Sequence, residues 1–275
     1  MNARNPEQGW FAADDAVAAI REGHADNPQD WPRLAVETGF VETESAYYER
    51  LREATLTAAR EAVAERERAD DQQLIHAVRA LDDCARTANE LTERVGEWAT
   101  AYDSDARVDI EYVRELASQE TDSPTEARLH ALAACVVALD AEREQLRAHI
   151  ERTAPGVAPN LSALAGPILA VRLIALAGGL SELAKKPAGT VQVLGAEDAL
   201  FAHLRGNAAP PKHGIIFTHD AVRATAPGNR GSAARALAGK LAIAARIDHY
   251  SGELRPELAS DLDERIERIR ARDSS

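Results

Sequence analysis

The residues best suited to chemistry in this sequence are basic side chains that would face a common ligand. Arg235 and Arg246 are eleven residues apart in a helical pattern, so they point within about 20° of one helix face and lie about 16 Å apart along the axis. Two basic loops accompany them, Lys185-Lys186-Pro187 and Pro211-Lys212-His213. Such groups bind phosphates. Together they favour nucleic-acid binding, although each alone is also typical of an ordinary exposed helix or loop.

Charge is distributed unevenly along the chain. Residues 161–250 hold 10 Lys or Arg and 5 Asp or Glu, a net +5, whereas residues 1–160 hold 17 and 33, a net −16. Phosphate affinity depends on local positive fields, so the overall charge of −13 does not exclude a nucleic-acid ligand. Acidic surfaces with 28 arginines but only 4 lysines are typical of a high-salt cytoplasm.

Signals for catalysis are missing from the sequence. The glycine runs at 178–179 and 228–231 match neither GxGxxG nor GxxxxGK[ST], and the eight histidines lack the i, i+4 pairing of a helical metal site. Cys84 and Cys135 lie among small apolar residues and are predicted to be buried free thiols. We therefore predict a protein that is not an enzyme and that holds no metal or cofactor.

The elements that must position the basic residues are mainly helical. No apolar run approaches the roughly 20 residues that cross a bilayer, and residues 1–10 lack a signal-peptide pattern, so we expect a soluble, cytoplasmic protein. We divide it into an N-terminal element (1–43), a helical coiled-coil region (44–158), a basic all-α module (159–252) and a charged helical tail (253–275) that we read as solvated.

The N-terminal element is predicted to be small and of mixed α/β type. Asp14 is the expected cap of a helix that ends at Gly23, while Pro28 and Pro32 mark a loop. Leu34, Val36 and Phe40 are the expected strand or packing positions.

Two long antiparallel helices, at about 70–100 and 124–151, are predicted to follow. The second begins at a Ser123-Pro124-Thr125-Glu126 capping box and is ended by Pro155 and Pro159. A 3,4 spacing gives it a coiled-coil seam: Leu129, Leu132, Val136, Leu139, Arg143, Leu146 and Ile150. Spacing alone leaves self-association and a purely intramolecular hairpin equally open, and Arg143 fits either a register device or an exposed edge.

The basic module begins with Asn160, the expected cap of an apolar helix that Pro167 kinks or restarts. Short helices follow, a strand pattern occurs only at 214–217, and a last strong helix runs from about 232 to 249 and is closed by Gly252.

Several motifs in this module resemble the Nop domain family, in the same order along the chain. They are APNLSALAGP at 158–167, RLIALAGGLSELAK at 172–185, PAGTVQVLGAE at 187–197, PKHGIIF at 211–217 and AARALAGKLAIAARID at 233–248. The helix at 74–98 also resembles the coiled-coil helix of the family. This resemblance implies the scaffold of archaeal box C/D ribonucleoprotein particles, which guide 2′-O-methylation of ribosomal and transfer RNA.

The resemblance also implies partners and site residues. The partners are a box C/D guide RNA, a kink-turn-binding ribosomal-type protein, the fibrillarin methyltransferase, and a second copy joined through the coiled coil. The implied protein contacts are Gln192 and Glu197. The residues expected to contact RNA are Lys185, Ala188, Lys212, His213, Arg230, Arg235, Lys240 and Arg246.

Three departures from the family pattern weaken parts of this assignment. Asp198 and Ser232 stand where the family usually has lysine, and the N-terminal domain is much shorter than the α/β unit of the family. The alternative hypothesis is a helical dimerisation protein whose Nop-like module makes protein contacts only.

Overall fold

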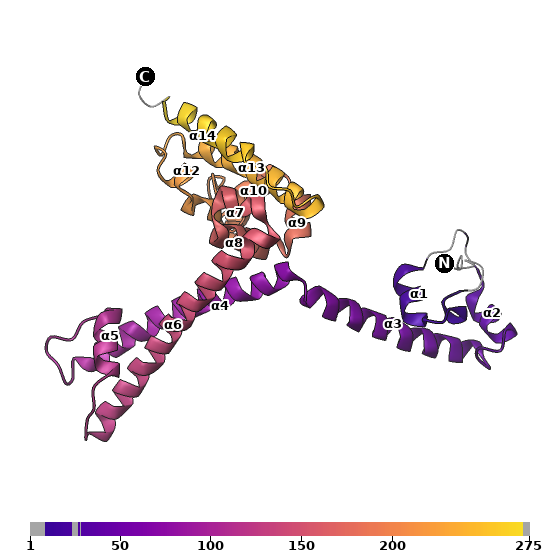
Figure 1. The fold of residues 1–275 in the computed structure, drawn as a ribbon, viewed down its shortest axis with the longest axis horizontal. Helices are drawn as coiled ribbons and strands as arrows, with labels where there is room; N and C mark the ends of the chain where they lie inside the picture. The colour runs from indigo at the N-terminus through magenta and orange to yellow at the C-terminus, as the bar shows by residue number, and fades with distance from the viewer. Residues whose placement is uncertain (1–8, 24–26, 28, 272–275) are drawn as a thin grey trace. The chain divides into compact units, whose positions relative to one another are not determined.

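All of the regular secondary structure in the described residues is helical. The computed structural model describes residues 9–23, 27 and 29–271, and within these it contains α- and 3₁₀-helices and no strand (Figure 1). The prediction of a mainly α protein is confirmed. The chain divides into two compact units, Met1–Ala69 and Asp70–Ser275.

The first unit packs its helices around aromatic rings. Its elements are η2 (Trp10–Ala12), α1 (Ala16–Glu22), α2 (Trp31–Glu37) and α3 (Glu44–Glu67). The Trp10 Nε1–H group donates a hydrogen bond to the Tyr47 hydroxyl at 3.1 Å, and the rings of Phe11 and Phe40 stack with centroids 5.4 Å apart. These contacts tie the segment before α1 and the turn after α2 to the start of α3.

The expected α/β character of this unit is wrong. Leu34 and Val36 lie in α2, because Pro32 occupies the first turn of that helix, where a missing N–H costs nothing, and so begins the helix instead of marking a loop. Asp15 caps α1 in place of Asp14, since its side chain accepts a hydrogen bond from the Ala18 amide at 2.9 Å. Pro28 lies outside the described residues.

The predicted antiparallel hairpin is confirmed in α4 (Asp70–Ala99) and α6 (Pro124–Val157), with α5 (Ile110–Ala117) in the connection between them (Figure 1). One core joins the end of α4 to the start of α6, and another joins the start of α4 to the end of α6. The seam residues pack in these cores, with Leu129, Val136 and Ile150 fully covered and Leu132, Leu139 and Leu146 partly covered.

Two details of the hairpin differ from expectation, and the contacts of a third residue are defined. Pro155 lies inside α6, which continues to Val157, because only the carbonyl of the exposed Glu151 loses its helical partner there. Cys135 is exposed and not buried, since it lies beside the seam and not on it. Arg143 pairs at 2.8 Å with the buried Asp140 one turn earlier in α6, and the other oxygen of Asp140 holds Arg114 of α5 at 2.6 Å.

The C-terminal module wraps short helices around the long helix α13 (Arg230–Tyr250). They are α7 (Pro159–Ala165), α8 (Pro167–Ala177), α9 (Leu180–Lys185), α10 (Ala188–Val193), α11 (Glu197–Leu204), η3 (Ile215–Thr218), α12 (Asp220–Arg223) and α14 (Glu257–Arg270). Glycines allow the chain to break between α7 and α8 and again after α8, because Gly166 and Gly178 have φ of +76° and +91°. The strand pattern at 214–217 is wrong: it forms η3, whose Ile216 is buried among helices.

A buried clasp joins the start of α7 to the end of α13. Asn160 does not cap α7 but lies inside it, and Asp248 supplies the cap. The Oδ1 atom of Asp248 accepts hydrogen bonds from the Asn160 backbone amide at 2.9 Å and from its side-chain Nδ2 at 2.6 Å. The Oδ2 atom of Asp248 accepts one from the Leu161 amide at 2.9 Å. Asn160 also binds the Glu253 carbonyl and the Arg255 amide. The clasp holds the end of α13 against the start of α7.

The tail is not solvated as predicted. Its helix α14 buries four apolar side chains in the core of the module, Leu258, Leu262, Ile266 and Ile269. Lys240 of α13 pairs with Asp261 at 2.6 Å, and the Asn229 side chain donates to the Ile269 carbonyl at 3.3 Å. The module therefore extends through α14.

The hairpin and the module share a core. Val171 of α8 packs with Leu74 and Ile150 of the two hairpin helices. Asp71 at the start of α4 accepts a hydrogen bond from the Leu180 amide at 2.9 Å, which caps α9, and Arg172 pairs with Asp82. The basic module is thus attached to the hairpin by packing as well as by the chain.

By length and composition, no single helix among the described residues passes as a membrane span, while the sharply bent pair α7 and α8 passes only when its two helices are taken together.

Candidate nucleic-acid interface

Helix α13 presents the two arginines on its outer side. Arg235 and Arg246 are exposed, whereas Leu237, Leu241 and Ala244 are fully buried against the module. Alanines fill most of the remaining inward positions, which lets the short helices approach α13 closely. Neither arginine has a carboxylate partner among the described residues, so both charges are available to a ligand.

The first basic loop lies beside the second half of this helix. Lys185 ends α9 and pairs with Glu182 one turn earlier at 2.7 Å, an exposed pair of little energetic weight. Arg246 Nη2 donates a hydrogen bond to the Lys186 carbonyl at 3.3 Å. Ala188 begins α10 directly after Pro187, and it packs against the core. Lys185, Ala188 and Arg246 therefore belong to one site.

The second basic loop lies beside the first turn of α13. The aliphatic part of Lys212 lies close to Gly231, where an added Cβ would sit 4.0 Å from its Cβ and Cδ atoms. The loop is fastened to α10, because Gln192 Nε2 donates to the Lys212 carbonyl at 2.7 Å and the Gly214 amide donates to the Gln192 carbonyl at 2.8 Å. The backbone that carries Lys212 is thus held in place, while its ammonium group is exposed.

Gly231, Arg235 and Arg246 follow one side of α13. Lys212 lies beside Gly231 and the Lys186 backbone contacts Arg246, so the basic groups mark a strip about 22 Å long at 1.5 Å per residue. We call Lys185, Lys186, Lys212, Arg235 and Arg246 the basic strip. Its length allows contact with several successive phosphates.

A stack of three side chains lies at the Lys212 end of the strip. The rings of His213 and Phe217 are 4.5 Å apart and 18° from parallel, and Arg230 Cζ lies 5.3 Å from the centre of the Phe217 ring. Burial, and next the Arg230 charge, lower the pKa of His213, so its ring is neutral near pH 7. Arg230 also donates to the Thr225 carbonyl at 3.0 Å.

Not every residue predicted for the site has a free side chain. Lys240 faces α14, where its side chain is 20% exposed and paired with Asp261. Glu197 Oε1 accepts a hydrogen bond from the Gly195 amide at 2.9 Å, which fixes the turn before α11. The side-chain amide of Gln192 is engaged with the second basic loop.

Sequence reasoning missed Phe217 and underused Lys186. Phe217 ends the run at 214–217 whose composition resembles a strand, and that pattern gives no sign of a ring stacked on His213. The two positions that depart from the family pattern lie near helix starts, Asp198 in the first turn of α11 and Ser232 in the first turn of α13. A carboxylate in a first helical turn is stabilised by the helix dipole, which gives Asp198 a local role.

Comparison with known proteins identifies the family. The model of the family described as "Nop: snoRNA binding domain, fibrillarin" matches residues 69–269. The chain belongs to the Nop family. The matched range covers the hairpin and the module through most of α14, and so includes the entire basic strip.

Individual relatives are similar over parts of the chain. An uncharacterized NOP5 family protein of Methanocaldococcus jannaschii is 52% identical over 129 residues, which is 47% of this chain and 31% of the relative. Nucleolar protein 58 of Debaryomyces hansenii is 30% identical over 246 residues, 74% of this chain and 48% of the relative. Nucleolar protein 56 of Homo sapiens is 47% identical over 116 residues, which is 42% of this chain and 20% of the relative. The chain thus spans less than half the length of each of these relatives.

A similar fold occurs among solved structures. A chain in the crystal structure of a fibrillarin/Nop5p complex superposes with a TM-score of 0.54 at 25% sequence identity, over 96% of this chain and 99% of that chain.

Proposed function

We propose that this protein is the non-catalytic scaffold of a box C/D RNA-guided 2′-O-methylation particle. Its basic strip binds a kink-turn RNA together with the ribosomal-type protein already on that RNA, and the chain recruits fibrillarin, which carries out the methyl transfer. The observation that carries this proposal is the alignment of Lys212, Arg235, Arg246 and Lys186 along one side of α13 in a chain of the Nop family.

The strip suits RNA because its charges are held by backbone contacts while their tips remain exposed. Lys212 is fastened through Gln192, and Arg246 through the Lys186 carbonyl. Guanidinium groups hold phosphate oxygens in pairs, and the stacked pair of His213 and Phe217 adds an aromatic surface for an unpaired base. The contacts are thus of two kinds, phosphate contacts that set affinity and a stacking contact that favours an unpaired loop.

Docking of fibrillarin is assigned to the first unit. That unit is small, yet its aromatic cluster leaves Phe40 41% and Tyr48 59% exposed. Aromatic side chains of this kind are enriched at protein interfaces. The crystal structure of a fibrillarin/Nop5p complex contains a chain that resembles this one, which supports the same partner here.

Homodimerisation is assigned to the side of α6 that faces away from α4. Small residues recur there at 4,3 spacing, with a single glutamine among them: Ala127, Ala131, Ala134, Ala138, Ala141, Gln145 and Ala148. Most of them are exposed in the single chain. Alanine at such positions lets a second helix approach closely, so this stripe provides a second seam opposite the one filled by α4.

The test is a gel shift at high salt with a box C/D guide RNA, with and without its kink-turn protein, followed by fibrillarin. We expect binding to the preformed RNA–protein complex and then recruitment of fibrillarin. Arg246→Glu reverses a charge where the basic strip meets the first basic loop and should weaken assembly at least tenfold. Arg79→Glu, the same change at an exposed position on α4, is the matched control and should bind normally.

The outcomes separate the two hypotheses. Failure to bind RNA in either form, with a folded protein and a normal dimer, would favour the module that makes protein contacts only. Assembly unaffected by Arg246→Glu would show that RNA does not use the basic strip.

A further inference from the structure

Helix α9 carries the first basic loop at its end, yet the residue that precedes the helix does not cap it. Gly178 and Gly179 lead into α9 with φ of +91° and +141°, a backbone path that favours glycine. Gly179 occupies the cap position and has no side chain that could accept a hydrogen bond. The first N–H groups of an α-helix therefore need acceptors from elsewhere, and at Leu180 the acceptor comes from α4.

Asp71 in the first turn of α4 supplies that acceptor. Its Oδ2 accepts the hydrogen bond from the Leu180 amide at 2.9 Å, and the residue is only 8% exposed. Ile75, one turn further along α4, belongs to the same buried core as Leu180 and Leu183 of α9. Residues four apart lie on one side of a helix, so α4 holds α9 both by a charge-assisted hydrogen bond and by packing.

The other end of α9 reaches the basic strip. Lys185 is its last residue, and the Lys186 carbonyl accepts a hydrogen bond from Arg246 of α13 at 3.3 Å. A helix of only six residues depends on tertiary contacts for its stability. The contact with Asp71 at the start and the contact with Arg246 at the end together set where the two lysines lie.

We propose that Asp71 is a positioning residue of the RNA-binding site, through which the start of the hairpin sets the RNA affinity of the first basic loop. Asp71 is buried and acts through α9 without contacting the RNA. It holds the helix so that Lys185 and Lys186 lie beside Arg246, where the three charges can contact neighbouring phosphates. The inference rests on the proposed function, because it concerns how the basic strip uses its first loop.

The test measures binding of the full-length protein to a box C/D guide RNA carrying its kink-turn protein, over a range of salt concentrations. Asp71→Ala removes the acceptor and should weaken binding about fivefold or more. It should also lower the slope of log affinity against log salt by about one to two units, because two lysines lose their phosphates. Asp71→Asn keeps an oxygen that can accept from the Leu180 amide, so it should retain most of the affinity.

A double-mutant cycle separates positioning from a general loss of structure. Lys185→Gln with Lys186→Gln removes the charges of the loop that Asp71 is proposed to hold. In that background Asp71→Ala should cause little further loss, since residues that act through one another are not additive. An equal loss in both backgrounds would show that Asp71 does not act through the lysines and would overturn the proposal.

Hydrogen exchange in the unaltered protein gives a second readout that needs no variant. Coupling between two sites is reciprocal, so RNA held by Lys185 and Lys186 should in turn stabilise the contact at the start of α9. We expect exchange of the Leu180 amide to slow in the RNA complex. Exchange that RNA leaves unchanged would contradict the proposed coupling.

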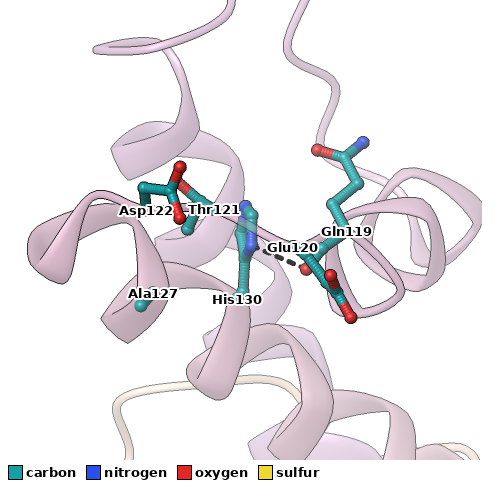
Figure 2. Close-up of a pocket in the computed structure, with 6 residues that line it drawn as sticks. All are labelled: Gln119, Glu120, Thr121, Asp122, Ala127 and His130. Carbon is teal, nitrogen blue, oxygen red and sulfur yellow. Dashed lines mark hydrogen bonds between the residues drawn. The ribbon is translucent and has the colours of Figure 1, made fainter.

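Two control variants remove contacts of the same hairpin that do not reach α9. Asp82→Ala breaks the ion pair with Arg172 of α8, a further link between the hairpin and the module. His130→Ala acts at the opposite end of the hairpin, where His130 Nδ1 donates a hydrogen bond to the Gln119 carbonyl at 3.0 Å (Figure 2). Both should leave the RNA affinity and its salt slope unchanged, and circular dichroism checks that every variant is folded.

The outcomes distinguish this inference from the proposed function. Absence of binding by the unaltered protein would refute the proposed function and this inference with it. Binding that Asp71→Ala leaves unchanged, or that the control variants weaken equally, would refute the inference alone.

Discussion

The clasp at Asp248 gives the sharpest test of how α13 is held. Asp248→Asn keeps the shape of the side chain and removes its charge. One oxygen can still accept the two hydrogen bonds from Asn160. The new amide nitrogen would then face the Leu161 N–H group, which at present donates to Asp248 Oδ2 at 2.9 Å. One buried donor loses its acceptor and meets another donor.

The magnitude follows from these contacts. A hydrogen bond to a charged acceptor contributes about 1.5–3 kcal/mol and one to a neutral acceptor about 1, so the two retained bonds weaken together by about 1–4 kcal/mol. Leaving the Leu161 amide unsatisfied costs about 1–3 kcal/mol more, because Asp248 is only 7% exposed. Loss of the favourable charge at the start of α7 adds a few tenths. We expect a total of at least about 2 kcal/mol.

Urea unfolding followed by circular dichroism measures this loss. The midpoint should fall while the slope stays constant, since the surface exposed on unfolding does not change. Asp261→Asn is the matched control, because it removes the charge of an exposed carboxylate that pairs with the partly buried Lys240, and it should cost about 1 kcal/mol or less. A loss below 1 kcal/mol for Asp248→Asn, or equal losses for the two variants, would refute the argued role of the clasp.

Three further predictions concern separate parts of the molecule. Burial lowers the pKa of His213 below 6.5, so the unfolded chain binds more protons and stability falls as the pH drops through about 6.5. His213→Gln should therefore flatten the dependence of the urea midpoint on pH in that range, and an unchanged dependence would contradict this prediction. Burial and the hydrogen bond to Asp103 raise the pKa of Tyr112 to about 12, so ultraviolet titration should show one tyrosine ionising well after the others, and Tyr112→Phe should remove that late step. Ala138→Glu places a charge in the proposed dimer seam and should give a monomer by light scattering with unchanged helicity, whereas a persistent dimer would exclude this stripe.

Helical periodicity in the sequence was sufficient for much of this fold. The 3,4 spacing of Leu129 to Ile150 predicted α6 and its buried side, and the Ser123-Pro124 start signal placed its first residue. The eleven-residue interval between Arg235 and Arg246 predicted that both would be exposed on one side of α13. These features depend on residues close together in the chain, and helix geometry relates them directly.

Tertiary structure decided what local patterns could not. Lys240 looked like a further phosphate ligand until α14 brought Asp261 to it, and Asn160 looked like a cap until Asp248, 88 residues away, took that role. The run at 214–217 has the composition of a strand, yet it packs as η3 because no neighbouring strand is present among the described residues to pair with it. Hydrogen-bond and ion-pair partners are chosen by which segments lie side by side in the fold, and the spacing within one segment carries no record of them.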